Sequence, residues 1–250
     1  RGRSFRRGAD MIRGAACIAL ALLTLASPAA AQKKIPVDLE LSFVVDASGS
    51  IDQEEIQLQR QGYADALANP EVLKAVSSGF LRSIAISYIE FAADGCIWQW
   101  VDWVKISGLA SATAAGKRIL AAPREFCSGG NAIGDAVAFA AKSTLENGFD
   151  GTRKVIDVSG DGPDTTGLIA VEDARADALA KGFTINGLVI HRPSMPNLGD
   201  YYRTSITGGP RSFVIQAKSR RSFADAIVKK LILEISDLVP DRQQAARQAP

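Results

Sequence analysis

The chain of 250 residues lacks an excess of charge of either sign, since its formal net charge is +2. Five arginines and one aspartate give residues 1–31 a charge of +4, which leaves −2 for the other 219 residues. A nearly neutral body without a basic stretch offers no electrostatic surface for the phosphates of nucleic acid. We therefore expect no binding to DNA or RNA.

Two common catalytic and nucleotide-binding patterns are also missing at the positions that come closest to them. Ala47-Ser48-Gly49 is not the G-x-S-x-G elbow of a serine hydrolase. Gly160-Asp161-Gly162 lacks the G-x-G-x-x-G spacing of a dinucleotide loop. The hydrophobic fraction of 47% and the charged fraction of 22% are ordinary for a globular chain, which excludes disorder, collagen and coiled coil over most of the length.

Residues 1–31 have the pattern of a signal peptide. Arg13 precedes an uncharged apolar run, Ala15–Ala26, and an A-x-A cleavage pattern ends at Ala31. The run is shorter than the ~20 apolar residues that span a bilayer, and no later run reaches that length. We expect cleavage between Ala31 and Gln32, and a periplasmic or secreted mature chain without a transmembrane segment.

Cysteine is scarce, and export changes what the few cysteines mean. Cys17 lies inside the signal peptide, so the mature chain keeps Cys96 and Cys127, an even number in an oxidising compartment. A disulfide between them is the default expectation. A metal-thiolate site is the less favoured alternative, because two cysteines and the single histidine, His191, cannot fill the four-ligand shell of zinc.

Apolar runs and amphipathic stretches alternate along the rest of the chain. The apolar runs predict strands at 39–45, 84–91, 155–158, 185–190 and 213–215, and an alternation of side chains predicts another at 97–106. Helices are predicted at 52–68, 109–121, 132–146 and 168–181, followed by a last helix with Phe223, Ile227, Leu231, Ile235 and Leu238 on one face. The Asp94-Gly95 turn indicates that 97–106 is an antiparallel edge strand after a hairpin.

This order indicates an α/β fold: a doubly wound, mostly parallel, Rossmann-like sheet with one antiparallel edge strand. We interpret residues 32–240 as one domain, because no repeat or linker interrupts them. Residues 241–250 are expected to form a flexible tail. Residues 1–10 precede Met11 and are a candidate for upstream translated sequence.

Three loops are expected to bring oxygen donors to the carboxyl edge of the sheet, where open α/β sheets bind ligands. They are Asp46-Ala47-Ser48-Gly49-Ser50, Ser128-Gly129-Gly130-Asn131 and Ser159-Gly160-Asp161-Gly162-Pro163. Carboxylate, hydroxyl and amide oxygens suit a hard cation such as Mg²⁺, Mn²⁺ or Ca²⁺. The alternative is that Asp46, Asn131 and Asp161 only cap the helices that follow them.

The D-x-S-x-S pattern of Asp46, Ser48 and Ser50 resembles the signature of the von Willebrand factor A-type (VWA) domain, with its metal-ion-dependent adhesion site (MIDAS). The second loop of that family normally offers a threonine after Gly-Gly, where this chain has Asn131. The third loop of the family ends in Asp-Gly, as Asp161-Gly162 does here. The order of elements is similar over residues 36–239.

Two longer stretches, VSGDGP at 158–163 and Tyr201–Phe213, resemble a group of exported bacterial VWA proteins of uncharacterised function. The family resemblance implies a VWA fold and a non-catalytic module that binds a protein partner through a divalent cation. It implies the metal ligands Asp46, Ser48, Ser50, Asn131 and Asp161. A carboxylate from the partner would complete the metal shell.

The sequence is also compatible with two other functions. One is a metal-dependent hydrolase in which Asp46 acts as nucleophile or base, and the other is a VWA scaffold with a vestigial site. The missing machinery, with no second histidine and no G-K-[ST] phosphate loop, disfavours the hydrolase.

Some individual side chains also keep two interpretations. His191 is a base or, more in line with a lone strand-end histidine, structural. Trp98 and Trp100 are expected on one face of their strand and Trp103 on the other, which favours core packing over an exposed binding stripe. Asp157 in a buried strand has no interpretation from the sequence.

Overall fold

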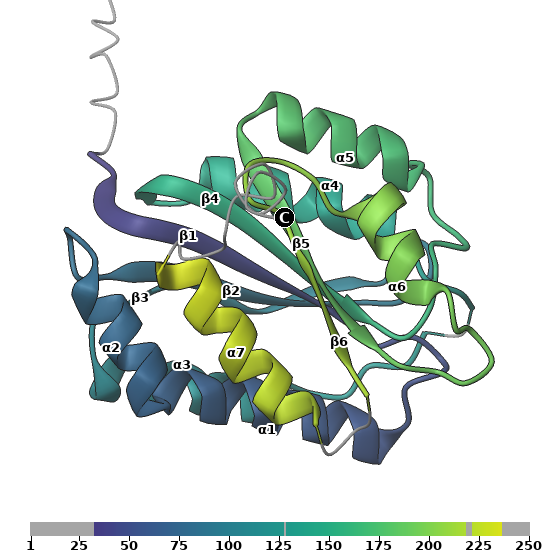
Figure 1. The fold of residues 1–250 in the computed structure, drawn as a ribbon, viewed down its shortest axis with the longest axis horizontal. Coiled ribbons are helices and arrows are strands. Elements are labelled where there is room, and N and C mark those ends of the chain that lie inside the picture. The colour runs from purple at the N-terminus through teal and green to yellow at the C-terminus, as the bar shows by residue number, and fades with distance from the viewer. Residues whose placement is uncertain (1–32, 128, 219–221, 237–250) are drawn as a thin grey trace, which may run out of the picture. The chain divides into compact units, whose positions relative to one another are not determined.

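The computed structural model describes residues 33–127, 129–218 and 222–236 (Figure 1). The predicted signal peptide, the predicted tail at 241–250 and Leu238 lie outside the described residues, so those predictions stay untested. Within the described part of the chain, no helix has the length and apolar character that crossing a membrane requires.

One six-stranded sheet carries the fold, with the strand order β3-β2-β1-β4-β5-β6. The strands are β1 (Ile35–Asp46), β2 (Ile84–Phe91), β3 (Ile97–Ile106), β4 (Phe149–Gly160), β5 (Phe183–Ile190) and β6 (Val214–Ala217). All neighbouring strands are parallel except β2 and β3, which pair antiparallel and leave β3 at an edge. The predicted fold class, including its antiparallel edge strand, is confirmed.

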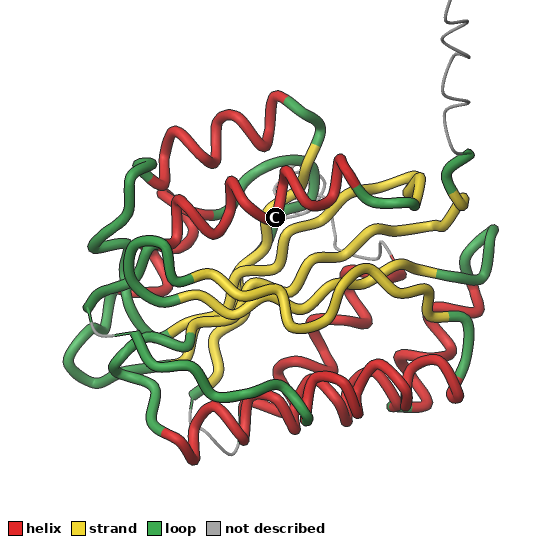
Figure 2. The backbone as a smooth tube through the Cα atoms, turned by 180° about the vertical axis from the view of Figure 1, so that it is seen from behind, coloured by secondary structure: helices red, strands yellow, loops and turns green. Residues whose placement is uncertain are grey.

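Helices cover both faces of the sheet (Figures 1 and 2). One face is covered by α1 (Gln53–Ala68), α2 (Pro70–Ser78), α3 (Leu109–Leu120) and α7 (Phe223–Ser236). The other is covered by α4 (Ile133–Glu146), α5 (Val171–Ala180), α6 (Leu198–Tyr201) and the π-helical turn η1 (Tyr202–Ile206). Because side chains alternate along a strand, β1 sends Leu41 and Phe43 into the first core and Val44 into the second.

Helix α2 and the α6–η1 segment were not predicted. Asn69-Pro70 carries a start signal for α2, because the Asn69 side chain accepts the Glu71 N–H and Pro70 occupies the first turn. The segment 198–206 combines a four-residue helix with a π-helical turn, so it has no sustained 3.6-residue period. Strand β4 is also longer than predicted, since its first residues alternate between buried and exposed instead of forming an apolar run.

Asp157 of β4 is explained by a cluster of buried polar side chains beneath α7. The Lys230 ammonium lies 2.6 Å from Oδ1 of Asp157 and also contacts Glu234. Asn186 of β5 donates to Oε1 of Glu234 over 2.9 Å. Burial raises the pKa of the Asp157 carboxyl to about 7; the charge of Lys230 opposes this rise and that of Glu234 adds to it. The cluster ties α7 to the centre of the sheet.

The three tryptophans of β3 divide between the two faces as predicted. Trp98 and Trp100 stack with ring centroids 6.2 Å apart, and Trp100 donates its indole N–H to Glu90 over 2.9 Å. Trp103 instead donates to the hydroxyl of Ser143 in α4 over 2.9 Å. All three rings are half-buried, so they belong neither wholly to the core nor to an exposed stripe.

Candidate metal centre

The predicted ligands come together at the carboxyl ends of β1 and β4. These strands are parallel neighbours, and Val45 stands opposite Ser159 in their register. The residues that follow, Asp46 and Asp161, are therefore brought close: the Asp161 N–H lies 3.5 Å from Oδ2 of Asp46. Figure 2 shows the loops gathered at this end of the sheet.

The first loop is folded around the buried carboxyl group of Asp46. Its Oδ1 accepts the Ser48 N–H over 2.8 Å, which closes a tight turn and leads the chain back over the strand end. The hydroxyl groups of Ser48 and Ser50 lie 3.2 Å apart. Ser50 then donates to Oδ1 of Asp161 over 2.9 Å. Four of the five predicted ligands thus form one hydrogen-bonded set.

Asn131, the fifth predicted ligand, is buried next to this set without a hydrogen bond from its side chain to the other four residues. Its amide nitrogen lies 2.5 Å from the point where a Cβ at position 162 would stand. A side chain at position 162 would therefore force the Asn131 amide to move. The backbone of Asn131 is fixed by two hydrogen bonds to Thr165. The Asn131 N–H donates to Oγ1 of Thr165 over 2.9 Å, and the Thr165 N–H donates to the carbonyl of Asn131 over 2.9 Å.

The capping alternative is wrong for all three residues. Helix α1 follows Asp46 but is capped by Asp52, which forms a capping box with Glu55. Helix α5 follows Asp161, and its N-cap residue, Ala170, makes no side-chain capping hydrogen bond. The first turn of α4 donates the N–H groups of Ile133 and Gly134 to Asp164, over 2.7 and 3.2 Å. The side chains of Asp46, Asn131 and Asp161 are therefore not used as helix caps.

The electrostatics of the site favour a positive charge between the two carboxyl groups. Burial raises the pKa of Asp46 to about 6; hydrogen bonds from Ser48 oppose this rise, and the charge of Asp161 adds to it. The two carboxylates therefore repel one another in a poorly solvated place. A cation bound between them would remove that repulsion.

The donor set fits a hard cation. Nowhere in the described ranges do three or more His, Cys, Asp or Glu side chains form a metal-binding group. The candidate centre instead combines two carboxylates with hydroxyl and amide oxygens, the donors that Mg²⁺ and Ca²⁺ accept. The two carboxylates of the protein balance the charge of a divalent cation.

A family model described as "Protein of unknown function (DUF1194)" matches residues 36–239. The chain belongs to this family. A search of curated protein sequences finds no match.

Solved structures with the same fold are VWA-domain proteins of low sequence identity. The pilus adhesin SpaC from Lactobacillus rhamnosus GG has a TM-score of 0.59 and 15% identity, covering 82% of this chain and 31% of that one. The proximal thread matrix protein 1 (PTMP1) of mussel byssus has a TM-score of 0.57 and 15% identity, over 82% and 47%. Another structure of PTMP1 contains a zinc-occupied MIDAS motif.

A third structure, the vWF domain of the type V pili tip protein Mfa5 from Porphyromonas gingivalis, has a TM-score of 0.57 and 9% identity, over 82% of this chain and 97% of that one. The fold of this DUF1194 chain is therefore that of a VWA domain. The chain spans about a third of the length of the adhesin and about half of that of PTMP1.

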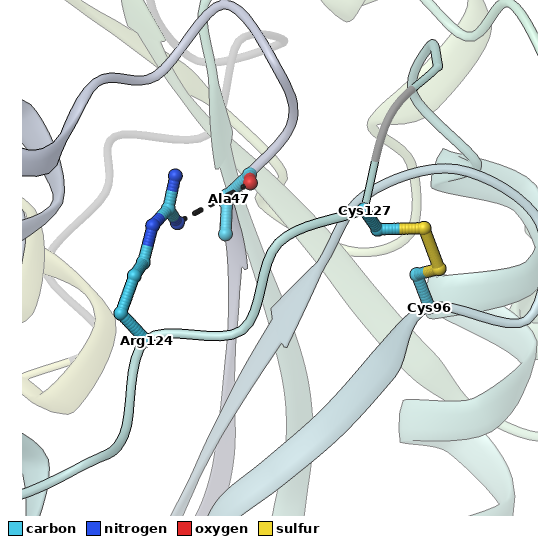
Figure 3. The surroundings of a disulfide bond; sticks show 4 residues. All are labelled: Ala47, Cys96, Arg124 and Cys127. Atoms are coloured by element: carbon cyan, nitrogen blue, oxygen red, sulfur yellow. Dashed lines mark hydrogen bonds between the residues drawn. A yellow bond between two sulfur atoms is a disulfide. The ribbon is translucent and has the colours of Figure 1, made fainter.

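The predicted disulfide is confirmed, and it lies beside the D-x-S-x-S loop (Figure 3). Cys96 and Cys127 are bonded, with their Cα atoms 6.3 Å apart. Between α3 and Cys127, the Arg124 side chain reaches back to this loop. It donates to the carbonyl of Ala47 over 3.4 Å and to that of Ile51 over 2.8 Å. Arg124 therefore holds both ends of the loop that carries Ser48 and Ser50.

The segment that bears Arg124 is itself held from the other side by Arg60. This buried guanidinium pairs with both carboxylate oxygens of Glu90 at 2.8 Å and donates to the carbonyl of Pro123 over 2.9 Å. Neither Arg60 nor Arg124 was predicted from the sequence. The sequence gives only a faint signal for Arg60. An arginine on the buried face of a helix would need a charged partner, because charged side chains are rarely buried without one.

Two more groups at the site were missed. Arg192, in the loop after β5, places Nη1 3.4 Å from Oδ2 of Asp161. The hydroxyl of Tyr202 lies 3.4 Å from the carbonyl of Gly162, and burial raises its pKa well above the ordinary value. His191 is exposed, and its backbone N–H donates to the carbonyl of Ala217 over 2.9 Å.

Proposed function

We propose that this chain is an exported VWA module that binds a protein partner through a divalent cation. The proposed ligands are Asp46, Ser48, Ser50, Asn131 and Asp161. The observation that carries the proposal is the hydrogen-bonded set of Asp46, Ser48, Ser50 and Asp161 at the carboxyl edge of the sheet. No side chain of this set is needed to cap a helix, so its convergence calls for another explanation.

The residues of the chain would divide the work of binding between them. Asp46 and Asp161 balance the charge of the cation, and the hydroxyl groups of Ser48 and Ser50 orient lone pairs towards it. The amide of Asn131 adds a neutral oxygen from the second loop. When bound, the cation supplies a positive centre that attracts a carboxylate of the partner. We propose Mg²⁺ as the cation, with Mn²⁺ or Ca²⁺ as substitutes.

The proteins with the same fold support a binding role. They include a pilus adhesin, a pilus tip protein and a matrix protein of the byssus, one of them with zinc at its MIDAS motif. The hydrolase alternative gains nothing from the geometry, because Asp46 is fully buried and a nucleophile must reach its substrate. We therefore propose a module without catalytic activity.

The metal site is tested by calorimetry on the mature chain, starting at Gln32. We expect one Mg²⁺ site with a Kd on the order of 10⁻⁴–10⁻³ M, because a shell left open to solvent binds loosely. Asp46→Ala should abolish the binding and leave the circular dichroism spectrum intact. The control is Asp52→Ala, which removes the cap of α1 at a cost of ~1 kcal/mol but no proposed ligand.

Equal metal uptake by wild type and Asp46→Ala would show that the ligands are wrongly assigned, and no uptake by wild type would favour the vestigial scaffold. Export is tested by N-terminal sequencing of the mature protein, which should begin at Gln32. The partner is sought by affinity capture from a periplasmic extract, once with Mg²⁺ and once with EDTA. A protein retained only with Mg²⁺ supports the proposal, and one retained equally in both contradicts it.

A further inference from the structure

Arg192 reaches the candidate metal centre from a loop that carries no proposed ligand. Its Nη1 lies 3.4 Å from Oδ2 of Asp161. The arginine side chain is 36% exposed, whereas the side chain of Asp161 is 7% exposed. The guanidinium therefore covers the solvent side of a carboxyl group that is otherwise buried.

Both oxygens of Asp161 are engaged in this arrangement. Ser50 donates its hydroxyl to Oδ1 over 2.9 Å, and Arg192 stands at Oδ2. A hydroxyl can turn its proton away and offer a lone pair to a cation, whereas a guanidinium has donors only and keeps its charge. A divalent cation at Asp161 and the guanidinium of Arg192 therefore compete for the same carboxylate.

The main chain at Arg192 is held by hydrogen bonds, whereas its side chain is partly exposed to solvent. The preceding residue, His191, donates its N–H to the carbonyl of Ala217 over 2.9 Å. The N–H of Met195 closes a turn onto the carbonyl of Arg192 over 3.0 Å. A guanidinium displaced from Asp161 would consequently stay within reach of the site, on the long side chain of a fixed residue.

We propose that Arg192 occupies the place of the cation beside Asp161 and, once a cation displaces it, binds the carboxylate of the partner. The inference rests on the proposed function and names a second group that recognises the partner. The fork of donors on a guanidinium matches the two oxygens of a carboxylate. An aspartate or glutamate side chain of the partner would thus contact the cation and Arg192 together.

The first half of the proposal is tested by titrating Mg²⁺ into wild type, Arg192→Gln and Arg203→Gln. Removing the competitor in Arg192→Gln should tighten Mg²⁺ binding about two- to fivefold, the range for a partly exposed ion pair. Arg203→Gln is the matched control, because it removes the same charge from an ion pair with Asp200 at 3.2 Å. We expect this control to bind Mg²⁺ as wild type does.

The outcomes separate this proposal from the proposed function. If wild type binds Mg²⁺ and Arg192→Gln does not bind it more tightly, the role of Arg192 is rejected but the proposed function is not. The same holds if Arg203→Gln shows an equal increase in Mg²⁺ affinity. Uptake by Arg192→Gln but not by wild type supports that role in its strongest form, because a vestigial ligand set would bind Mg²⁺ in neither protein. If none of the three proteins takes up Mg²⁺, the proposed function is wrong and the role of Arg192 is rejected with it.

The second half is tested with acetate as the carboxylate probe and Mn²⁺ as the cation. Acetate is titrated into Mn²⁺-saturated protein while the relaxation rate of water protons is followed. We expect acetate to bind about threefold more weakly to Arg192→Gln than to wild type or Arg203→Gln, as for the loss of an exposed charge-assisted contact. Equal acetate affinities in the three proteins would show that Arg192 does not bind the carboxylate. Melting temperatures confirm that the variants are folded.

Discussion

Lys230→Met is the substitution for which the structure predicts the clearest loss of stability. The side chains of Lys230 and Asp157 are each 1% exposed, and the ammonium group of Lys230 contacts both Asp157 and Glu234. Methionine keeps most of the volume of the lysine stem but removes the charge. The substitution therefore leaves two buried carboxyl groups facing each other with no cation, while the packing of α7 changes little.

The magnitude follows from the burial of the cluster. Breaking a buried ion pair by removing one partner destabilises a protein by about 3–5 kcal/mol, because the remaining charge is left without compensation. For a domain of about 200 residues, each kcal/mol lowers Tm by roughly 2–4 °C. We therefore expect Lys230→Met to lower Tm by about 10 °C at pH 8, and the free energy of unfolding by about 3–5 kcal/mol.

The loss should depend on pH, with a defined sign. The folded pKa of Asp157 is raised to about 7 from the ordinary value of 3.8. The folded protein therefore holds a proton that the unfolded chain releases, and stability falls as pH rises from about 4 through about 7. Without Lys230 the pKa of Asp157 rises further, because the lysine charge was lowering it. In the variant the decline should therefore continue with the same slope above pH 7, where that of wild type levels off.

Urea denaturation followed by circular dichroism at pH 5.5 and pH 8 measures this difference. The loss of unfolding free energy should be clearly smaller at pH 5.5, where Asp157 is protonated. The control is Lys229→Met, the same change at the neighbouring exposed position of α7, which should cost less than ~0.5 kcal/mol. A loss below ~1 kcal/mol at pH 8, or an equal loss at both pH values, would refute the reasoning.

Two further predictions concern the loops around the candidate metal centre. Replacing Cys96 and Cys127 by alanine opens a loop with a sequence separation of 31 and should lower the free energy of unfolding by roughly 3–4 kcal/mol in urea denaturation. It should also weaken Mg²⁺ binding, because the segment that bears Arg124 loses one of its anchors, and unchanged affinity would separate the disulfide from the site. Asn131→Thr should tighten Mg²⁺ binding more than Ca²⁺ binding, since a shorter donor suits the ~2.0–2.1 Å shell of Mg²⁺ better. Calorimetry with both ions checks this, and an unchanged ratio of the two affinities would remove Asn131 from the shell.

The positions of most strands along the chain could be predicted because they leave a local mark in the sequence. Residues 84–91 are mostly apolar, as expected for β2, which is buried along its whole length, and the Asp94-Gly95 turn indicates the hairpin to β3. The ends of β4 left no such mark, because its first residues alternate between exposed and buried positions. Helix α2, at nine residues, was too short for its periodicity to stand out against the apolar positions around it.

The candidate site divides in the same way between local and distant signals. Asp46, Ser48 and Ser50 lie within five consecutive residues, so one short pattern identifies all three. Arg192 and Asp161 are neighbours only because β4 and β5 pair in the sheet. An arginine two residues after a strand has no pattern of its own, and its role depends on a pairing that the sequence does not display. The partner of Asp157 likewise lies 73 residues away on α7.

The framework around the D-x-S-x-S loop determines what can limit its affinity for a cation. Arg124 binds the carbonyl groups at both ends of the loop, and the Ser48 N–H closes the turn onto Asp46. Ordering of the loop is therefore completed on folding, and a cation need not supply the ~1–2 kcal/mol per residue that ordering the backbone costs. The affinity for a cation is then limited by the proposed open shell and by the competition from Arg192. A partner that adds a carboxylate to the shell and engages Arg192 removes both at once, so cation and partner should bind cooperatively.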